Sequence, residues 1–303
     1  MPLLASSYDL SKGTVTLSGA EETLLLTLYA RALDAESPRP ILSDQFAVKL
    51  VSQIKDLGYD FNRTSGSRLG SSFITDLVCM RTRMLDISTE KFLRRHAGPA
   101  MVLHLACGMD SRSLRVRWEG EGRLWIDADQ KEAVDLRRKL IKDPEPSEGK
   151  YQLIQPNIHD DAWLGDHEIP TDRPVLVVFE GLTPYLTQEE VYGLLRRIVS
   201  YFQQRGVHGE ICFDAGGAVS YYAASIWFNA TLNLMGTGFS CFYLNDPKTL
   251  EQNVPGLKFK ERIFGFSDLL TSGFSGWLMG LLGWLTDFFG ITSWIGGGYG
   301  FKF

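Results

Sequence analysis

The sequence contains few cysteines and no dense run of basic residues. Its four cysteines are widely spaced and include no C-x-x-C pair, so we expect a reducing compartment, no disulfide scaffold and no bound metal. The formal net charge of -5 argues against a nucleic-acid-binding surface. The first residues lack a basic segment followed by a full apolar one, which predicts no signal peptide and a cytoplasmic protein.

Length and composition are those of an ordinary globular protein. The 303 residues are 44% hydrophobic and 22% charged, enough for a packed core. Apolar residues at helical spacing, with capping signals and no preceding strand, predict an N-terminal helical cap over residues 1–98. Its expected helices run from Ser18 to before Pro38, from Ser43-Asp44 to Gly58 and from Ser72 to Arg95, with a loop over residues 62–72.

From residue 99 the pattern changes to alternating strands and helices, which predicts a doubly wound, mostly parallel sheet. The expected strands cover residues 101–105, 123–126, 151–155, 175–179 and 207–213, of which 175–179 is Val-rich, as a strand covered on both faces should be. The expected helices cover 131–141 and 187–202, and Thr187 with Glu190 three residues later predicts a cap for the second. Residues 258–264 and 299–303 are expected to add an antiparallel pair at the sheet edge. The predicted fold is therefore an α/β core over residues 99–303 with seven strands.

Two segments of this core depart from the pattern, and we interpret them as lid insertions at about residues 215–255 and 265–298. The stretch 269–286 has no formal charge and is rich in Gly, Leu, Trp and Phe. Breaks by Gly, Ser and Thr favour a lid over an apolar substrate rather than a membrane span. Weak contact of residues 269–295 with a membrane surface is the alternative.

The most informative stretch follows the first expected strand. Residues 102–112 pass from an apolar run into a small-residue turn, which in a parallel sheet brings backbone N–H groups to a ligand. The dinucleotide fingerprint G-x-G-x-x-G is not met, because Ala106, Gly108 and Ser111 occupy its positions. The next strand ends in Asp127 and Asp129. A carboxylate there accepts hydrogen bonds from ribose hydroxyls, so we expect a nucleoside-containing cofactor.

Four segments together resemble the S-adenosylmethionine-dependent O-methyltransferases of the leucine carboxyl methyltransferase and tetracenomycin-type polyketide methyltransferase group. They are the cap with Arg31 and residues 40–44 (P-I-L-S-D), residues 105–112 (L-A-C-G-M-D-S-R) with Arg115, residues 125–129 (W-I-D-A-D), and residues 179–186 (F-E-G-L-T-P-Y-L). The family patterns are L-G-A-G-x-D-T-R for the second segment and E-G-x-x-x-Y-L for the fourth. The resemblance implies a Rossmann-like class I methyltransferase fold and S-adenosylmethionine as the cofactor.

The resemblance also implies roles for residues along the cofactor. Gly108 would lie against its methionine portion, with Ala106 in the same turn, and Asp129 would hold the ribose hydroxyls. Asn157 and Ile158 would lie beside the adenine, where the family has Asp-Leu.

Three further residues are implied at the reacting end of the cofactor. Arg81 would pair with the cofactor carboxylate, for which a forked guanidinium is suited. Glu180 would lie near the cofactor's amino group or the methyl-transfer centre, and Tyr185 would form a pocket wall; we take both as candidate catalytic residues. From the residues alone, a surface charge on an amphipathic helix is the favoured interpretation of Arg81, and a cap of the following helix is the alternative for Asp129.

One departure from the family pattern requires a structural answer. Ala106 replaces the first glycine of the family's L-G-A-G turn. If this residue has a positive φ or touches the cofactor, its methyl group costs stability or affinity. Otherwise the replacement is neutral.

Methyl transfer from a sulfonium is an in-line displacement, so the protein has to align the acceptor and exclude water. A carboxylate acceptor is already ionised, whereas a phenol benefits from a general base. His104 lies inside the first expected strand, and His159 is the weak remaining candidate for a base. The sequence therefore favours a carboxylic acid or an acidic phenol.

We predict an S-adenosylmethionine-dependent O-methyltransferase that acts on an apolar or aromatic small molecule, such as a polyketide-like metabolite, because the last third is rich in Tyr, Trp and Phe. A methyltransferase-fold protein that has lost methyl transfer and uses its pocket for binding, cyclisation or rearrangement is the first alternative, which Ala106 and Asn157 fit. A carboxyl methyltransferase acting on a protein C-terminus and a nicotinamide-dependent oxidoreductase are weaker alternatives. The oligomeric state is left open.

Overall fold

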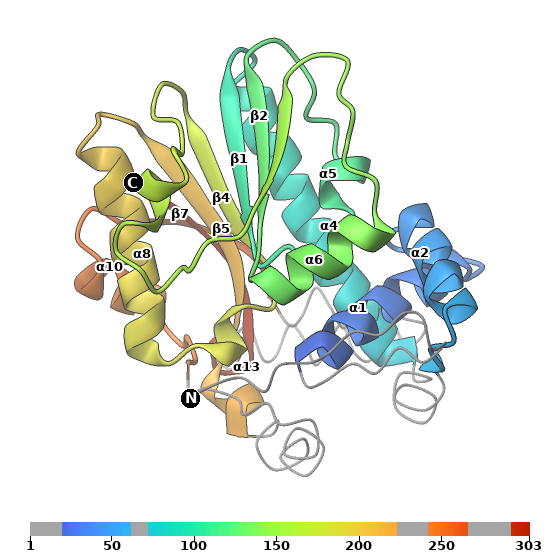
Figure 1. Cartoon of the computed structure of the whole chain (residues 1–303). Helices are drawn as coiled ribbons and strands as arrows, with labels where there is room; N and C mark the ends of the chain where they lie inside the picture. The colour runs from blue at the N-terminus through green and yellow to red at the C-terminus, as the bar shows by residue number, and fades with distance from the viewer. Residues whose placement is uncertain (1–19, 62–71, 223–241, 266–291) are drawn as a thin grey trace.

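A central sheet organises the computed structural model, which describes residues 20–61, 72–222, 242–265 and 292–303 (Figure 1). Within these ranges the sheet has seven strands in the order β3-β2-β1-β4-β5-β7-β6. The strands β1 to β5 are parallel, and β7 is antiparallel to both β5 and β6. The strands are β1 (Ala100–Leu105), β2 (Arg123–Ala128), β3 (Lys150–Ile154), β4 (Val175–Phe179), β5 (Gly209–Gly216), β6 (Lys258–Gly265) and β7 (Gly296–Lys302). The predicted mostly parallel sheet with an antiparallel pair at its edge is confirmed.

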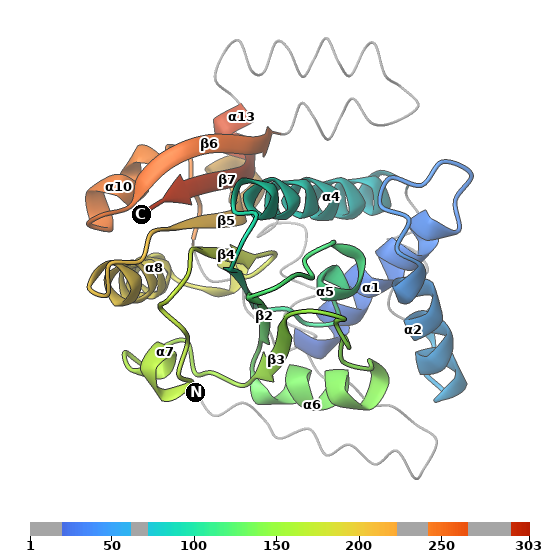
Figure 2. The ribbon, with the colours of Figure 1, turned by 90° about the horizontal axis from the view of Figure 1, so that it is seen from above.

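Helices cover both faces of the sheet, because alternate residues of a strand point to opposite faces. Met101 and Leu103 of β1 belong to the buried cluster that includes α8 (Gln188–Gln203). Val102 belongs to the cluster that includes α4 (Ser72–Arg95). Figure 2 shows α4 and α8 on opposite sides of the sheet. β4 accordingly reads as the uninterrupted apolar run expected of a covered parallel strand.

The helices begin at the capping signals that the sequence contains. Thr187 and Glu190 form the predicted capping box of α8, each satisfying a backbone N–H of the other. Asp44 caps α2 by accepting a hydrogen bond from the N–H of Ala47. The other described helices are α1 (Ala20–Ala35), α2 (Gln45–Asp56), α5 (Arg112–Arg115), α6 (Lys131–Leu140), α7 (Trp163–Asp166), α10 (Lys248–Asn253) and α13 (Thr292–Ile295), with a 3-10 helix η2 (Thr183–Tyr185).

The N-terminal helices make two kinds of contact. α1 and α2 pack on each other around a third buried cluster that includes Leu28, Leu50 and Ile54. α4, in contrast, places Leu85 and Phe92 in the cluster on one face of the sheet. α4 is therefore a layer of the α/β core as well as the third helix of the predicted cap, and a domain boundary at residue 98 stays a prediction.

Two strands differ from their predicted bounds by three residues at one end. β5 begins two residues later than predicted and ends at Gly216, and β7 begins three residues earlier, at Gly296. Glycine is depleted in strands, so the run 296–298 favoured a loop. The packing explains the glycines: a Cβ at Gly297 would lie 2.4 Å from Phe264 O, and one at Gly298 would lie 2.2 Å from the Phe264 ring. The two antiparallel strands approach too closely there for side chains.

Other predictions fall wholly or mostly outside the described residues. These are the capping signal at Ser18, the loop 62–72, and the greater part of the lid insertion 265–298 with the apolar stretch 269–286. Residues 223–241 of the other lid insertion also lie outside the described residues. Membrane contact through residues 269–295 therefore stays a prediction. Among the helices that the structure describes, none combines the length and the apolar character needed to cross a bilayer.

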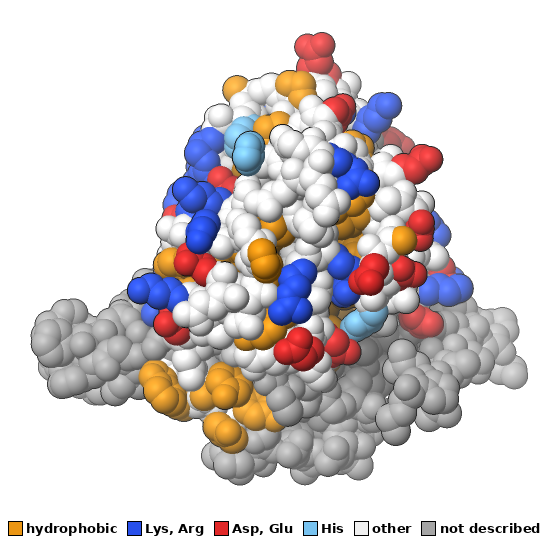
Figure 3. All heavy atoms as spheres, turned by 90° about the vertical axis from the view of Figure 1, so that its left-hand side faces the viewer, with side chains coloured by type: hydrophobic (Ala, Val, Ile, Leu, Met, Phe, Trp, Pro, Cys, Tyr) orange, Lys and Arg blue, Asp and Glu red, His pale blue; other side chains and the backbone are white. Residues whose placement is uncertain are grey.

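Charged side chains of both signs are mixed on the face shown in Figure 3. Lys and Arg side chains alternate there with Asp and Glu over the described part of the surface. A nucleic acid requires a continuous basic stripe or patch. This face does not provide one, in keeping with the net charge of -5.

Candidate functional site

The turn after β1 has an unusual backbone. Ala106 has a φ of 51° and Gly108 a φ of 45°, both in the left-handed region. Such a φ costs an L-residue about 1–2 kcal/mol, so the alanine at position 106 carries a strain that the family's glycine avoids. A Cβ at Gly108 would lie 2.7 Å from Leu24 Cδ2. Position 108 therefore favours glycine for its conformation, and a Cβ there would also displace the end of the Leu24 side chain.

Two buried arginines hold the carbonyl groups of this turn. Arg137, on α6, donates from Nη1 to Gly108 O at 3.0 Å and to Asp110 O at 2.6 Å. Arg31, on α1, donates from Nη2 to Met109 O at 2.8 Å. Three consecutive carbonyls thus face guanidinium groups that are almost wholly buried. The turn is fixed from behind by both the cap and the core, which offsets its backbone strain.

Asp129, which follows β2, contacts this turn directly. Its Oδ2 accepts from the N–H of Gly108 at 2.7 Å, and its Oδ1 accepts from the N–H of Gln130 at 2.7 Å. Burial raises the pKa of Asp129 above its ordinary value, although these two N–H groups act in the opposite direction. The N-cap of α6 is Gln130, so Asp129 is not the N-cap residue. Its two carboxylate oxygens can accept hydrogen bonds from the two hydroxyls of a ribose, so this carboxylate fits a nucleoside.

Asp127, two residues earlier, is a buried structural anion. It pairs with Arg137 at 2.8 Å, accepts hydrogen bonds from Ser113, Tyr151 and Trp125, and lies 2.9 Å from His104 Nδ1. Burial alone would raise the pKa of Asp127, but Arg137 and His104 hold it well below its ordinary value. His104 is 1% exposed, so the histidine in β1 is packed.

Glu180 follows β4 at the same edge of the sheet. It accepts hydrogen bonds from Arg81 Nε at 2.9 Å, Thr82 Oγ1 at 2.8 Å and Arg112 Nη2 at 2.6 Å. Arg81 Nη1 also donates to Asp214 Oδ2 at 3.1 Å, at the end of β5. Asp214 Oδ1 accepts from the N–H of Gly181 at 2.7 Å. The two predicted residues Arg81 and Glu180 are joined directly, and a carboxylate that the sequence did not single out completes the group.

The pKa values of the two carboxylates that bind Arg81, those of Glu180 and Asp214, are shifted in opposite directions. Burial would raise the pKa of Glu180, but Arg81 and Arg112 outweigh it and lower this pKa. Burial raises the pKa of Asp214, with Arg81 opposing and Glu180 reinforcing the rise. The Arg81 side chain is 23% exposed, and no described residue accepts a hydrogen bond from its Nη2. One guanidinium nitrogen is therefore available for a ligand carboxylate.

A buried ion network behind this edge was not predicted as a unit. Arg112 and Arg115 both bind Asp86 of α4, and Arg115 also reaches Asp110 and Asp44. Burial would raise the pKa of Asp110, but the guanidinium groups around it hold that pKa well below its usual range. One signal in the sequence could have indicated it. Asp110, Arg112 and Arg115 lie within six residues, in a turn and a four-residue helix where not all three charges can reach solvent. The network links α2, α4 and the turn.

The remaining predicted residues lie after β3 and in η2. Asn157 follows β3, its Oδ1 accepting from the N–H of His159 at 3.2 Å, and Ile158 packs against the main buried cluster. Tyr185 ends η2, close enough to Arg81 to influence its pKa. His159 is exposed, and its ring lies 3.9 Å from Glu190 on α8. The structure therefore gives His159 no place beside Glu180.

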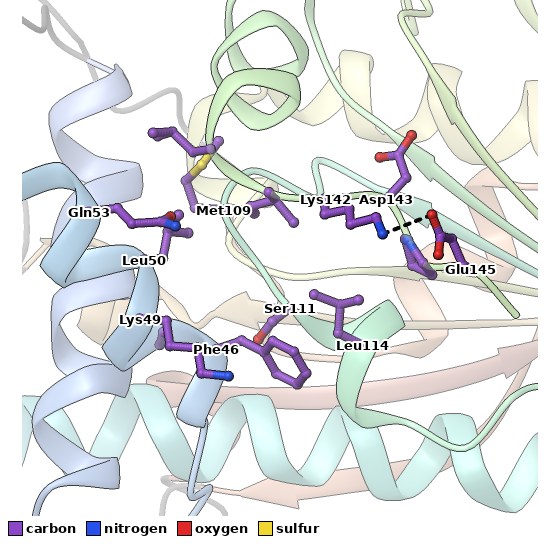
Figure 4. Close-up of a pocket in the computed structure, with 14 residues that line it drawn as sticks. Phe46, Lys49, Leu50, Gln53, Met109, Ser111, Leu114, Lys142, Asp143 and Glu145 are labelled. Carbon is purple, nitrogen blue, oxygen red and sulfur yellow. Dashed lines mark ion pairs between the residues drawn. The ribbon is translucent and has the colours of Figure 1, made fainter.

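A separate cavity of about 360 Å³ lies between α2 and the end of α6 (Figure 4). Apolar side chains such as Phe46 and Leu50 line it, and Lys142 pairs with Glu145 at its border. Met109 connects it to the back of the turn after β1, but none of the predicted site residues lines it. In the described ranges, no three His, Cys, Asp or Glu side chains are grouped to hold a metal ion.

Comparison with known proteins gives consistent matches. The model of a family described as leucine carboxyl methyltransferase matches residues 25–199. The chain is 56% identical over 298 residues to the S-adenosyl-L-methionine-dependent methyltransferase dpfgK of Gibberella zeae, covering 98% of this chain and all of that relative. It is 36% identical over 249 residues to the tetracenomycin polyketide synthesis O-methyltransferase TcmP of Streptomyces glaucescens, covering 82% of this chain and 84% of that relative.

A solved structure has the same fold. A DUF574 family protein from Streptomyces avermitilis aligns with a TM-score of 0.54, covering 94% of this chain and 97% of that one. The two sequences are only 10% identical, so the likeness concerns the fold alone. The strand order, with one antiparallel strand inserted near the edge, is that of the class I methyltransferase fold implied by the sequence resemblance.

Proposed function

Because the chain belongs to the leucine carboxyl methyltransferase family and is an S-adenosylmethionine-dependent methyltransferase, we propose that it methylates an oxygen atom of an apolar or aromatic small molecule. The acceptor atom is a carboxylate or a phenolic oxygen. One relative is named as a polyketide O-methyltransferase, which supports this acceptor class. The observation that carries the proposal is the group of Arg81, Glu180 and Asp214 at the carboxyl edge of the sheet, the edge at which the turn after β1 also lies.

The cofactor, when bound, supplies an electrophilic methyl group on a sulfonium. In our proposal Gly108 lies against its methionine portion, in a turn whose positive φ favours glycine. Asp129 accepts hydrogen bonds from the ribose hydroxyls, and Asn157 and Ile158 lie beside the adenine. These positions follow the ends of three neighbouring parallel strands, β1, β2 and β3, the usual place for a ligand of such a sheet.

In our proposal the reacting end of the cofactor lies beside the residues that follow β4. Arg81 offers its available Nη2 to the cofactor carboxylate, and Glu180, ionised by its two arginines, faces the cofactor's amino group. Tyr185 forms part of the acceptor wall. The contribution of these residues is alignment and exclusion of water, because the in-line displacement needs an oxygen held directly behind the methyl group.

The test is a methyl-transfer assay with a panel of apolar carboxylic acids and phenols, in which the methylated product is identified by mass spectrometry. We expect wild-type protein to methylate an oxygen in this panel. Glu180→Gln should reduce kcat/KM by about tenfold or more, since it removes a charge at the transition-state end of the site. The matched control Glu145→Gln alters a carboxylate at the separate cavity and should leave transfer unchanged.

Wild-type protein that binds S-adenosylmethionine but methylates no oxygen would contradict the proposal. That result would favour the alternative in which the fold is kept for another use of its pocket. Circular dichroism and the melting temperature of Glu180→Gln have to be checked in parallel, because Glu180 partners two buried guanidinium groups.

A further inference from the structure

Glu180 and Asp214 lie side by side at the carboxyl edge of the sheet. The β4–β5 register pairs Phe179 with Phe213, so the next residues of the two strands are at the same level. Their side chains are 9% and 12% exposed. Ligands of parallel α/β sheets bind outside this edge. Both carboxylates therefore border the place where an acceptor has to lie.

The two carboxylates have unequal partners. Glu180 accepts from the guanidinium groups of both Arg81 and Arg112, whereas Asp214 accepts from Arg81, which it shares, and from a backbone N–H. The pKa of Glu180 is lowered and that of Asp214 is raised. When the pKa values of two neighbouring carboxylates are shifted in opposite directions, the group with the raised pKa is suited to take a proton and the other stays ionised. A cofactor carboxylate on Arg81 would raise the proton affinity of Asp214 further.

No histidine competes for this role, and all five lie in the described ranges. His104 is enclosed between Asp127 and Arg112, and His159 lies beside Glu190. His96 and His208 lie at the opposite edge of the sheet, near the starts of the strands, and His167 ends α7. The charged groups that face Asp214 are Arg81 from α4 and Glu180 from the end of β4, with Tyr185 of η2 near Arg81.

We propose that Asp214 is the catalytic proton acceptor for a hydroxyl substrate, so that the acceptor is a phenol rather than a carboxylic acid. This inference rests on the proposed O-methyl transfer. The phenolic O–H bond breaks and its proton passes to Asp214 Oδ2, while the new O–CH₃ bond forms and the sulfonium S–CH₃ bond breaks. The cofactor leaves as the neutral thioether, and Asp214 returns its proton to water. A carboxylic acid would not need this group, because it is ionised before it binds.

The experiment compares acceptors of similar shape and different acidity in wild type and Asp214→Asn. For a phenol with a pKa of about 10 we expect kcat/KM to fall about 10²–10⁴-fold in the variant. For a phenol that is already ionised at the assay pH the variant should be nearly as active as wild type. The dissociation constant of S-adenosylmethionine should not change. Asp214→Glu, which keeps a carboxylate, should restore part of the activity toward the weakly acidic phenol.

The pH profiles add a second readout. Wild-type kcat/KM for the weakly acidic phenol should decline as pH falls through the raised pKa of Asp214, because the protonated carboxyl accepts no proton. In Asp214→Asn, kcat/KM should instead rise about tenfold per pH unit with the phenolate fraction. If Asp214→Asn does not fold, the wild-type profiles decide. A decline with the phenol and not with a carboxylic acid supports the inference, and identical profiles overturn it.

Two other results would overturn the inference. An equal loss for all acceptors, together with weaker cofactor binding, would mean that Asp214 acts only by holding Arg81. Wild-type protein that methylates carboxylic acids and no phenol would remove the need for a proton acceptor while leaving O-methyl transfer intact. Failure of the proposed function is distinct from both, because wild-type protein would then methylate no oxygen at all. Asp143→Asn, an exposed aspartate at the separate cavity, is the matched control and should behave as wild type.

Discussion

Replacing Ala106 by glycine should stabilise the protein slightly, contrary to the usual effect of introducing glycine. The φ of Ala106 is 51°, which costs an L-residue about 1–2 kcal/mol and costs glycine almost nothing. The glycine also lowers the free energy of unfolding by about 0.4–1 kcal/mol, because it gives the unfolded chain more conformational entropy. The difference favours Ala106→Gly by about 0.5–1 kcal/mol.

The assay is differential scanning calorimetry. Unfolding entropy of about 2.1 cal/mol/K per residue gives about 0.6 kcal/mol/K for the whole chain, so Tm should rise by about 1–2 °C. Two controls give the opposite sign. Ala100→Gly, in buried β1, should destabilise by about 0.5–1 kcal/mol. Gly108→Ala should destabilise by about 1 kcal/mol or more and weaken cofactor binding, since its Cβ would meet Leu24.

Calorimetric titration with S-adenosylmethionine completes this test. Ala106→Gly should bind the cofactor at least as tightly as wild type, because the glycine adopts the turn without strain. If Ala106→Gly lowers Tm as much as Ala100→Gly does, the turn does not have the backbone described, and the strain argument is refuted.

Three further predictions concern stability. Arg137→Met removes hydrogen bonds to two turn carbonyls and takes the guanidinium partner from the buried Asp127, so urea unfolding should show a loss of about 3–5 kcal/mol; a loss below about 1 kcal/mol would contradict this. The pKa values of Asp110 and Asp127 are lower folded than unfolded, so their stabilising effect is complete above about pH 5 and is lost as pH falls below about 4. Tm should decline over that range, and a constant Tm down to about pH 3 would count against it. Thr187→Ala breaks the capping box with Glu190 and should cost about 1 kcal/mol in the same unfolding assay, with no effect expected for a solvent-facing substitution elsewhere on α8.

The sequence was sufficient for features that depend on local pattern. The Val-rich run of β4 and the capping box at Thr187 both have short-range signals, and both are found where they were predicted. The glycine run that begins β7 was missed because it is a strand only through its close approach to Phe264, a long-range contact.

The contacts among the charged groups of the site are also long-range, so local sequence pattern does not predict them. Arg81, Glu180 and Asp129 were selected because the family pattern marks them, and the structure brings the first two into contact. Asp214 carries the signal that was used for Asp129, an acidic residue at the end of an apolar strand, but none of the four family segments includes it. Pairing of Asp86 with Arg112 joins residues on separate helices, and nothing in the local sequence of either reveals it.

The most direct test of the central claim is calorimetric titration of wild type, Asp129→Ala and Asp143→Ala with S-adenosylmethionine, with NADH as the control ligand. We expect wild type and Asp143→Ala to bind S-adenosylmethionine with the same affinity, Asp129→Ala to lose most of it, and NADH not to bind. That result would place the cofactor at the turn after β1, on the carboxylate that contacts Gly108. Unchanged binding in a folded Asp129→Ala, or a loss in Asp143→Ala, would contradict the account and point to the cavity between α2 and α6 instead.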